Sequence, residues 1–353
     1  MKIIIIHNLF YEIIFLSISN EKVNLFYGTL YTRKEQSIMK PAVLIPIIIG
    51  SVLLVAGGVL ISIGVKNNRI APRVTNTYTI NENFSNFDIN IETADLAFKV
   101  SEDNSNKVVC EETEKDKHEV SVINNTLTIK YHDERKWHEK IFHFNFARMK
   151  VTVYLTELEF DSLKINMSTG DVSVPNNFTF NSVNTTQSTG DCHFNANIVN
   201  ESSFKTTTGY ITMENMNAPA LNLNVTTGDI SLKNVHVTNN IQIDITTGRI
   251  NLDSVTAKNY KSVSSTGTVV LKDSVIENEI NIRTSTGDVR FDRSDAATLD
   301  IETSTGDVTG TFLTSKIFHV ETSTGSIDVP PTTEGGLCKI KTSTGDVSLN
   351  IVQ

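Results

Sequence analysis

A Thr-Gly pair recurs at a fixed interval through the second half of the chain, and this repeat constrains the fold more than any other feature. Successive glycines are 19 or 20 residues apart. The residue two before each glycine is Ser or Thr, and Asp follows the glycine in six of the ten units. The ten glycines are Gly170, Gly190, Gly209, Gly228, Gly248, Gly267, Gly287, Gly306, Gly325 and Gly345. Self-similarity at so short a period predicts an architecture of stacked repeats.

Apolar residues alternate with polar ones around each glycine, which is the period of a β-strand. The second residue after the glycine is Val, Ile or Cys in every unit. The fifth residue before it is apolar in all units except two, which carry Thr185 and Ser262. Each unit is therefore predicted to contain two strands that direct one face into a core.

The Ser/Thr-Thr-Gly-Asp segment is interpreted as the turn between the two strands. Glycine suits it because glycine adopts positive φ without a steric penalty, and the aspartate is expected to accept hydrogen bonds from local backbone amides. A second turn carries Asn or Asp, as at Lys233 and Asn234 or at Asn239 and Asn240. One unit of this size buries too little apolar surface to fold alone, so each coil should lie on the next. We expect an all-β, single-chain parallel β-solenoid (β-helix) of about ten coils over residues 161–353, because a propeller blade would need about 40–45 residues.

Residues 74–160 are predicted to form an irregular β-rich cap and the first degenerate coils. Strand candidates lie at residues 87–91, 120–123, 127–131 and 150–155, and residues 89–93 resemble a decayed coil. A solenoid with an open end would template aggregation, so a cap is expected before the first regular coil.

The N-terminal part contains a candidate membrane anchor. Residues 42–65 are 24 residues without a charge, flanked by Lys40, Lys66 and Arg69. At about 1.5 Å per residue this helix would be roughly 36 Å long, enough to cross a hydrocarbon core of about 30 Å. The run is long for a cleaved signal peptide, which favours a single-pass protein of the cell membrane. The flanking charges nearly balance, so they do not fix the orientation.

Residues 1–38 precede this segment and fit neither a signal peptide nor a domain, because polar residues break their apolar runs below spanning length. We expect an untranslated or disordered extension, with Met39 as the true start. N-terminal mass spectrometry that found peptides from residues 1–38 would refute this.

Charge and cysteine usage exclude several function classes. Residues 161–353 carry 14 Asp and 7 Glu against 9 Lys and 4 Arg, and such an acidic surface repels phosphate backbones, so we expect no nucleic-acid partner. The three cysteines, Cys110, Cys192 and Cys338, are far apart and predict neither a disulfide framework nor a zinc knuckle. They are expected to be small core residues, and no cofactor or metal is predicted.

Two metal-binding interpretations are weaker than their structural alternatives. The aspartates after the glycines could bind Ca²⁺ between coils, but Tyr210, Arg249, Thr268 and Ser326 interrupt the column, which favours solvated turns. His138 and His143 are five residues apart, whereas a zinc-protease helix needs four, which favours an exposed loop.

Two surface patterns also have structural alternatives. In Thr303-Ser304-Thr305 the first threonine shares the side of Ile301, so we expect an inward threonine ladder and no ice-binding face. Asp288, Arg290, Asp292 and Arg293 could converge as in a polysaccharide-cleaving enzyme, although interleaved surface charge is favoured.

The Thr-Gly-Asp-Val coils, the irregular β region before them and the N-terminal apolar segment together resemble the bacterial putative-adhesin family of β-strand-repeat proteins, a domain of unknown function related to auto-transporter-like adhesin heads. The resemblance covers roughly residues 75–353 and implies fold better than activity. Members often carry a proline in the strand before the first coil, and Val153-Tyr154-Leu155-Thr156 has none.

The resemblance implies a membrane-anchored, non-enzymatic adhesin-like protein with an extracellular solenoid and an unidentified protein or glycan surface partner. An accessory or sensor of a cell-envelope stress system is the alternative, with Gly50, Gly57 and Gly64 as a possible membrane contact face. A carbohydrate-active β-helix enzyme is weaker still.

Overall fold

The computed structural model describes residues 73–133 and 149–352, which form 27 strands and no helix. Within these ranges no helix is long and apolar enough to cross a bilayer. The predicted anchor at residues 42–65, the extension at 1–38 and the pair His138 and His143 lie outside the described residues.

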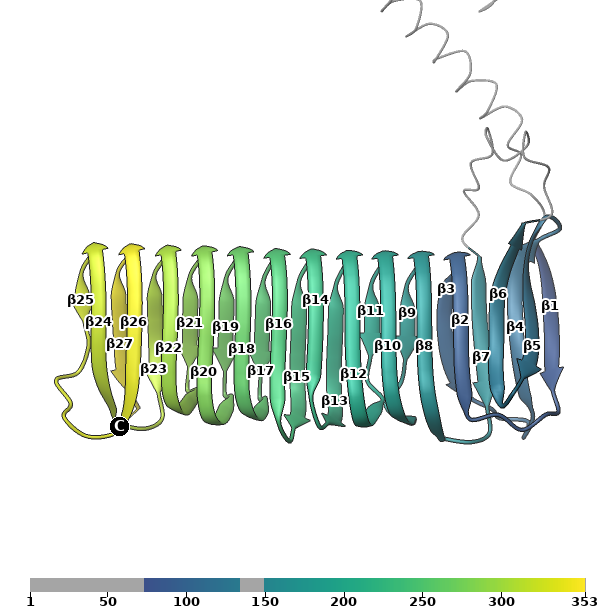
Figure 1. Cartoon of the computed structure of the whole chain (residues 1–353), viewed down its shortest axis with the longest axis horizontal. Helices are drawn as coiled ribbons and strands as arrows, with labels where there is room; N and C mark the ends of the chain where they lie inside the picture. Colours follow the sequence, from purple (N-terminus) through teal and green to yellow (C-terminus); the bar gives the residue numbers. More distant parts are fainter. Residues whose placement is uncertain (1–72, 134–148, 353) are drawn as a thin grey trace, which may run out of the picture. The chain divides into compact units, whose positions relative to one another are not determined.

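Each regular coil consists of a long strand, a corner at the repeated glycine and a second strand, which is mostly short. Long strands pair with long strands and second strands with second strands, all in parallel, so two stacks of strands enclose the core (Figure 1). The first stack contains β8 (Glu159–Thr169), β10 (Thr179–Thr189), β12 (Asn197–Thr208), β14 (Leu221–Thr227), β16 (Asn240–Thr247), β18 (Thr256–Thr266), β20 (Val275–Thr286), β22 (Asp295–Thr305), β24 (Lys316–Thr324) and β26 (Gly336–Thr344). The second contains β9 (Val172–Val174), β11 (Cys192–Phe194), β13 (Ile211–Ala218), β15 (Ile230–Val237), β17 (Ile250–Asp253), β19 (Val269–Lys272), β21 (Val289–Asp292), β23 (Val308–Phe312), β25 (Ile327–Asp328) and β27 (Val347–Ile351).

Equivalent residues of successive coils lie side by side. Ile230 of β15 is the register partner of Ile250 of β17, and both side chains are fully buried. Thr185 and Ser262, the two polar exceptions of the repeat, are also buried in the interior ladder. The predicted all-β solenoid of about ten turns is therefore confirmed, and its core is a column of stacked identical positions.

The corner glycines satisfy a second requirement besides positive φ. Gly228 has φ of 140°, and a Cβ built on it would lie 2.0 Å from the carbonyl oxygen of Gly209 in the preceding coil. The corners of adjacent coils thus approach too closely for any side chain at this position.

The chain already forms a coil of the same shape before the first repeat. Strand β2 (Asn86–Thr93) pairs in parallel with β8, with Ile89 beside Ile165, and β3 (Asp95–Val100) pairs with β9. The segment 89–93, expected to be a decayed coil, lies within β2, and Ala94 stands at the corner where the repeats have glycine.

The N-terminal end is closed by strands that leave the parallel pattern. Beyond β2 and β3 lie β6 (Thr126–Asp133) and β7 (Lys150–Leu155), both parallel to their neighbours. Three further strands pair antiparallel, β5 (Asp116–Ile123) on β6, β4 (Asn106–Thr113) on β7, and β1 (Arg73–Ile80) on β4. We call β1, β4 and β5 the cap.

The coils do not follow the order of the sequence at the C-terminal end, which corrects the expectation that each coil lies on the next. Strand β26 lies between β22 and β24, and β27 lies between β23 and β25 (Figure 1). The coil with the short β25 stands outermost, with Ile327 48% exposed and with Pro330 and Pro331 following Val329 after the strand. Proline cannot donate to a strand ladder, so this coil is suited to an end position, while the coil of β26 and β27 has neighbours on both sides and buries Cys338, Ile340, Val347 and Leu349.

Candidate functional site

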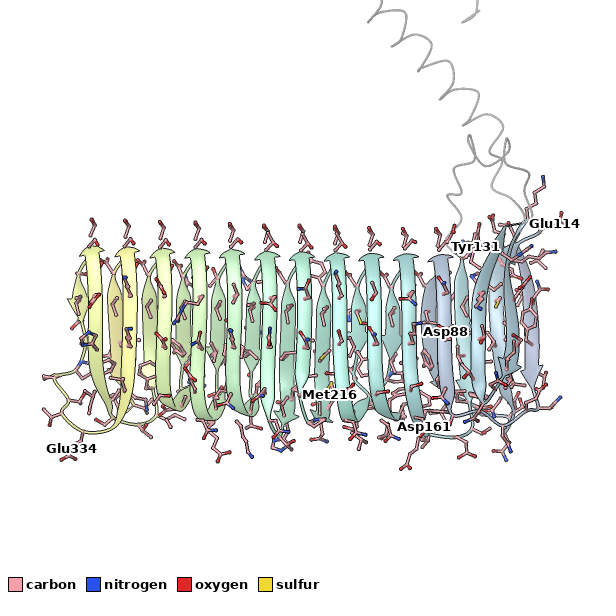
Figure 2. The ribbon with its side chains drawn as sticks, in the orientation of Figure 1. Asp88, Glu114, Tyr131, Asp161, Met216 and Glu334 are labelled. Atoms are coloured by element: carbon pink, nitrogen blue, oxygen red, sulfur yellow. The ribbon has the colours of Figure 1, made fainter. Side chains whose placement is uncertain are left out.

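The corner edge of the solenoid carries two exposed hydroxyl side chains in every coil. These are the Ser or Thr two residues before the glycine and the Thr directly before it, and all of them are exposed. Figure 2 shows the resulting row of side chains along the edge where the long strands end. We call this row the hydroxyl edge; it comprises Ser168, Thr169, Ser188, Thr189, Thr207, Thr208, Thr226, Thr227, Thr246, Thr247, Ser265, Thr266, Ser285, Thr286, Ser304, Thr305, Ser323, Thr324, Ser343 and Thr344.

The residue three before the glycine points the other way, into the core. Thr303 and Thr342 are buried, as the parity of the strand predicted, and Thr322 in the outermost coil is half-buried. The Thr303 hydroxyl donates to the Gly287 carbonyl oxygen at 3.3 Å. An inner threonine position thus ties neighbouring corners together, while the two residues after it form the hydroxyl edge.

The aspartates after the glycines form a ladder between coils. The Asp229 carboxylate accepts a hydrogen bond from the backbone N–H of Arg249, which is the equivalent position in the next coil, at 2.7 Å. Asp95, Asp171, Asp191, Asp288, Asp307 and Asp346 make the same bond to their neighbouring coils. The expected partner was a local amide, so the contact is corrected to a neighbouring one that the linear sequence does not show. The calcium interpretation stays the weaker one, since each of these carboxylates has a backbone partner.

Backbone hydrogen bonds also shift the acidity of this ladder. The N–H of Asp307 is the main cause that lowers the pKa of Asp288, and the N–H of Ser326 does the same for the pKa of Asp346. A donor aimed at a carboxylate stabilises its ionised form.

A bend within or directly after the second strand forms another row, in which residues other than glycine adopt the left-handed conformation. Asn215, Asn234, Ser254, Asp273 and Arg293 have φ between 46° and 60° and recur at the repeat interval. Asn234 Nδ2 donates to Asn215 Oδ1 at 3.0 Å. This bend is therefore also built from side-chain contacts between coils.

The acidic and basic residues considered for glycan cleavage do not converge. Arg290 pairs with Asp288 at 2.8 Å, whereas Arg293 pairs with Asp273 at 2.7 Å and with Asp292 at 3.2 Å. All five side chains are about one third exposed or more. These residues form three surface ion pairs in two separate groups.

The cysteines offer no nucleophile at the surface. Cys110, Cys192 and Cys338 are free and buried, and burial is the main cause that raises the pKa of each thiol to about 12. The thiolate is the reactive form, so these residues are inert as nucleophiles at neutral pH.

Two buried polar groupings were not predicted from the sequence. Lys316 pairs with Asp295 near the C-terminal end, and Cys110, Glu112 and His118 meet inside the cap. The second grouping has a sequence signal, because Cys110 and Glu112 are two residues apart and therefore share one face of a strand.

Comparison with protein families decides the classification. Two stretches, residues 84–254 and 238–353, match the model described as Toastrack DUF4097. The chain belongs to the Toastrack DUF4097 family. This agrees with the resemblance to the putative-adhesin β-strand-repeat proteins, and no curated protein matches this Toastrack chain.

Solved structures similar to this Toastrack chain include bacterial proteins of low identity. A putative adhesin from Parabacteroides distasonis is 9% identical with a TM-score of 0.45, and the match covers 80% of this chain and 98% of that one. A putative adhesin from Bacteroides fragilis is 14% identical with a TM-score of 0.38, over 80% and 97% of the two chains. A putative lipid binding protein from P. distasonis is 15% identical with a TM-score of 0.39, over 79% and 97%.

Proposed function

We propose that this Toastrack protein is a non-enzymatic, adhesin-like interaction protein of the cell envelope. Residues 42–65 would anchor it in the cell membrane as a single span, and the solenoid would lie outside the cell. Its partner is a surface glycan, bound along the hydroxyl edge.

The single observation that carries this proposal is the exposure of both hydroxyl residues in every coil of the solenoid. Each hydroxyl can donate one hydrogen bond and accept two, so the row matches a polyhydroxylated chain. Strand pairing repeats these groups at about 4.8 Å, which allows many weak contacts to act together. A protein partner would not repeat the same polar group at this spacing, so it would match the row less well than a glycan does.

Charge narrows the class of glycan. The chain has a net charge of −9, so acidic polymers are repelled. A neutral polysaccharide is therefore the better partner for the hydroxyl edge.

The non-enzymatic part of the proposal rests on the side chains of residues 73–133 and 149–352. In these ranges the free thiols are buried, and the acid and arginine residues between residues 288 and 293 form separate exposed pairs. A glycosidase needs two carboxyl groups that flank one bond in a shared groove.

Retention on immobilised neutral glycans would test the proposal. Cells that produce the tagged full chain should be retained on beads, and protease added outside should remove both the tag and the retention. A triple variant of the hydroxyl edge, Thr226→Ala, Thr246→Ala and Ser265→Ala, should reduce retention severalfold.

The matched control changes three exposed residues on the outer face of the long strands of the same coils, Asn222→Ala, Gln242→Ala and Lys261→Ala. It should retain the cells as the wild type does, with both variants melting cooperatively. Equal retention by the two triple variants would refute the role of the hydroxyl edge, and a solenoid resistant to external protease would refute the extracellular location.

A further inference from the structure

The core becomes more polar inside the cap, at the end of the solenoid where β1, β4 and β5 lie. Through the regular coils the inward positions are mostly aliphatic or aromatic. In the cap the buried positions include Glu112, Thr113, Asp116 and His118, and Asn76 and Tyr78 of β1 are half-buried beside them. Buried polar side chains at this density require partners, because a buried polar group without a hydrogen bond destabilises the fold.

Three of these cap residues present ligand atoms to a common point. Cys110, Glu112 and His118 are each 0–1% exposed, and the ligand atoms that they offer all lie within 4.8 Å of one another. Cys110 and Glu112 come from the same face of β4, and His118 comes from β5 after the corner. His118 Nδ1 lies 2.9 Å from Glu112 Oε2.

Neighbouring groups hold these side chains in place. Asn76 Nδ2 donates to Glu112 Oε1 at 2.5 Å, and the backbone N–H of His118 donates to Glu112 Oε2 at 2.7 Å. The Tyr78 hydroxyl donates to the His118 carbonyl oxygen at 3.0 Å. Such surrounding hydrogen bonds orient the ligands of metal sites.

One buried atom of this group lacks a partner. His118 Nε2 has no hydrogen bond among the described residues, although its side chain is fully buried. Nδ1, which lies 2.9 Å from Glu112 Oε2, is the imidazole nitrogen that faces the group and would be its nitrogen ligand. Nitrogen, sulfur and carboxylate oxygen together are the donor set of Zn²⁺, which binds them at about 2.0–2.3 Å.

We propose that Cys110, Glu112 and His118 bind a zinc ion that fastens the cap. Tetrahedral bonds of these lengths set ligand atoms roughly 3.3–3.8 Å apart, so atoms as far apart as 4.8 Å would close by about 1 Å, while His118 Nδ1 and Glu112 Oε2, now 2.9 Å apart, would separate slightly. On binding, the ion replaces the proton of the Cys110 thiol and breaks the hydrogen bond between Glu112 and His118. Both are present only in the metal-free group.

The fourth ligand would be a water molecule. Cys110, Glu112 and His118 are buried and do not themselves line the open depression of about 680 Å³ nearby, which is lined by Asn76, Tyr78 and Thr113. Zinc would have to pass Asn76 and Tyr78, which hydrogen-bond to Glu112 and His118. The ion links β4 to β5 across their corner and so stabilises the end of the solenoid against fraying.

Metal content and cobalt spectroscopy of the full chain in detergent test this proposal. After equilibration with Zn²⁺ and removal of free metal, the wild type should retain one zinc per chain and melt at a higher temperature than after chelation. With Co²⁺ it should show a thiolate-to-cobalt charge-transfer band in the near ultraviolet. Cys110→Ser should lose this band, and His118→Ala should lose the metal.

Matched controls separate this site from other donors. Cys192→Ser and Cys338→Ser remove the other buried thiols, and His138→Ala with His143→Ala removes the rival histidine pair; each should keep the metal and the band. A folded wild type that retains no metal overturns the proposal. A band that survives Cys110→Ser, or disappears with any control variant, overturns it equally.

Discussion

Lys316 reaches Asp295 across an entire coil that comes later in the sequence. Its Nζ lies 2.5 Å from Asp295 Oδ1, and both side chains are buried. Lys316 begins β24 and Asp295 begins β22, and between these strands lies β26, whose first residue, Gly336, is the register partner of Lys316. Any Cβ at Gly336 would lie 1.8 Å from the Ala297 carbonyl oxygen. The ion pair therefore passes over the inserted coil at Gly336, which has no side chain, and favours the strand order β22, β26, β24.

Loss of one partner of this pair should be costly. Lys316→Met leaves the Asp295 carboxylate buried without its cation, so we expect a loss of about 3–5 kcal/mol in the free energy of unfolding. Denaturant titration of the purified chain measures it. The double variant Lys316→Met with Asp295→Leu should lose less than the single one, because no charge remains buried.

An exposed pair of the same kind provides the control. Lys272 lies 3.4 Å from Asp253, with side chains 46% and 24% exposed. Lys272→Met should cost less than about 1 kcal/mol. Equal losses for Lys316→Met and Lys272→Met would contradict the role assigned to the buried pair.

Gly228→Ala should destabilise the solenoid by at least about 2 kcal/mol, because the residue needs positive φ and its new Cβ would meet the Gly209 carbonyl oxygen. Thermal and denaturant unfolding report the loss. The neighbouring Thr227→Ala changes an exposed side chain and should stay within about 0.5 kcal/mol of the wild type. Similar values for both variants would show that the corner tolerates a side chain.

Ser254→Asn should stabilise the chain by about 0.5–1 kcal/mol. Ser254 is exposed with φ of 60°, a conformation that asparagine adopts more readily than serine, and Asn234 holds the equivalent place in the previous coil. Asn234→Ser should lower stability by a similar amount. The prediction is wrong if both changes shift the unfolding midpoint in the same direction.

The aspartate ladder predicts an acid-sensitive contribution to stability. The folded-state pKa of Asp288 is lowered from 3.8, chiefly by the backbone N–H of Asp307. A depressed pKa contributes stability that is present above the unfolded value and is lost as pH falls through the folded value. Unfolding of the wild type should therefore become easier as pH falls below 3.8.

Asp288→Asn should lose less stability than the wild type between about pH 7 and about pH 3, because its side chain does not titrate. Urea titrations at both pH values measure the difference. The control is Glu277→Gln at an exposed position, which should lose as much stability between the two pH values as the wild type does. If Asp288→Asn lost as much stability between these pH values as the wild type does, the aspartate ladder would not be the source of the acid sensitivity.

The repeat made most of the fold predictable, because every unit has the same alternation of apolar residues around a corner glycine. Alternation around Gly228 or Gly248 fixes which side chains enter the core, and the interval of 19 or 20 residues fixes how the coils superimpose. Parity also placed Thr303 inside. These inferences needed only local periodicity and the geometry of strands.

Contacts between residues far apart in sequence were not predictable in this way. The Asp229 carboxylate meets the amide of Arg249 because stacking places it there, and a single coil gives no sign of it. The order of the sequence also did not predict that β26 lies between β22 and β24. Pro330 and Pro331 suit the coil of β24 and β25 to the end of the stack. The grouping of Cys110 with His118 depends on the corner between β4 and β5 in the cap, where the repeat does not apply.

Disulfide formation between engineered cysteines tests most directly whether the hydroxyl edge is one continuous row in the order of the structure. Thr305 is the register partner of Thr344, while Thr324 lies one strand further out, and the three native thiols are buried. Thr305→Cys with Thr344→Cys should crosslink under mild oxidation, since parallel neighbours are about 4.8 Å apart and a disulfide spans 4.4–6.8 Å between Cα atoms. Crosslinking of Thr305→Cys with Thr324→Cys, and not with Thr344→Cys, would contradict the account.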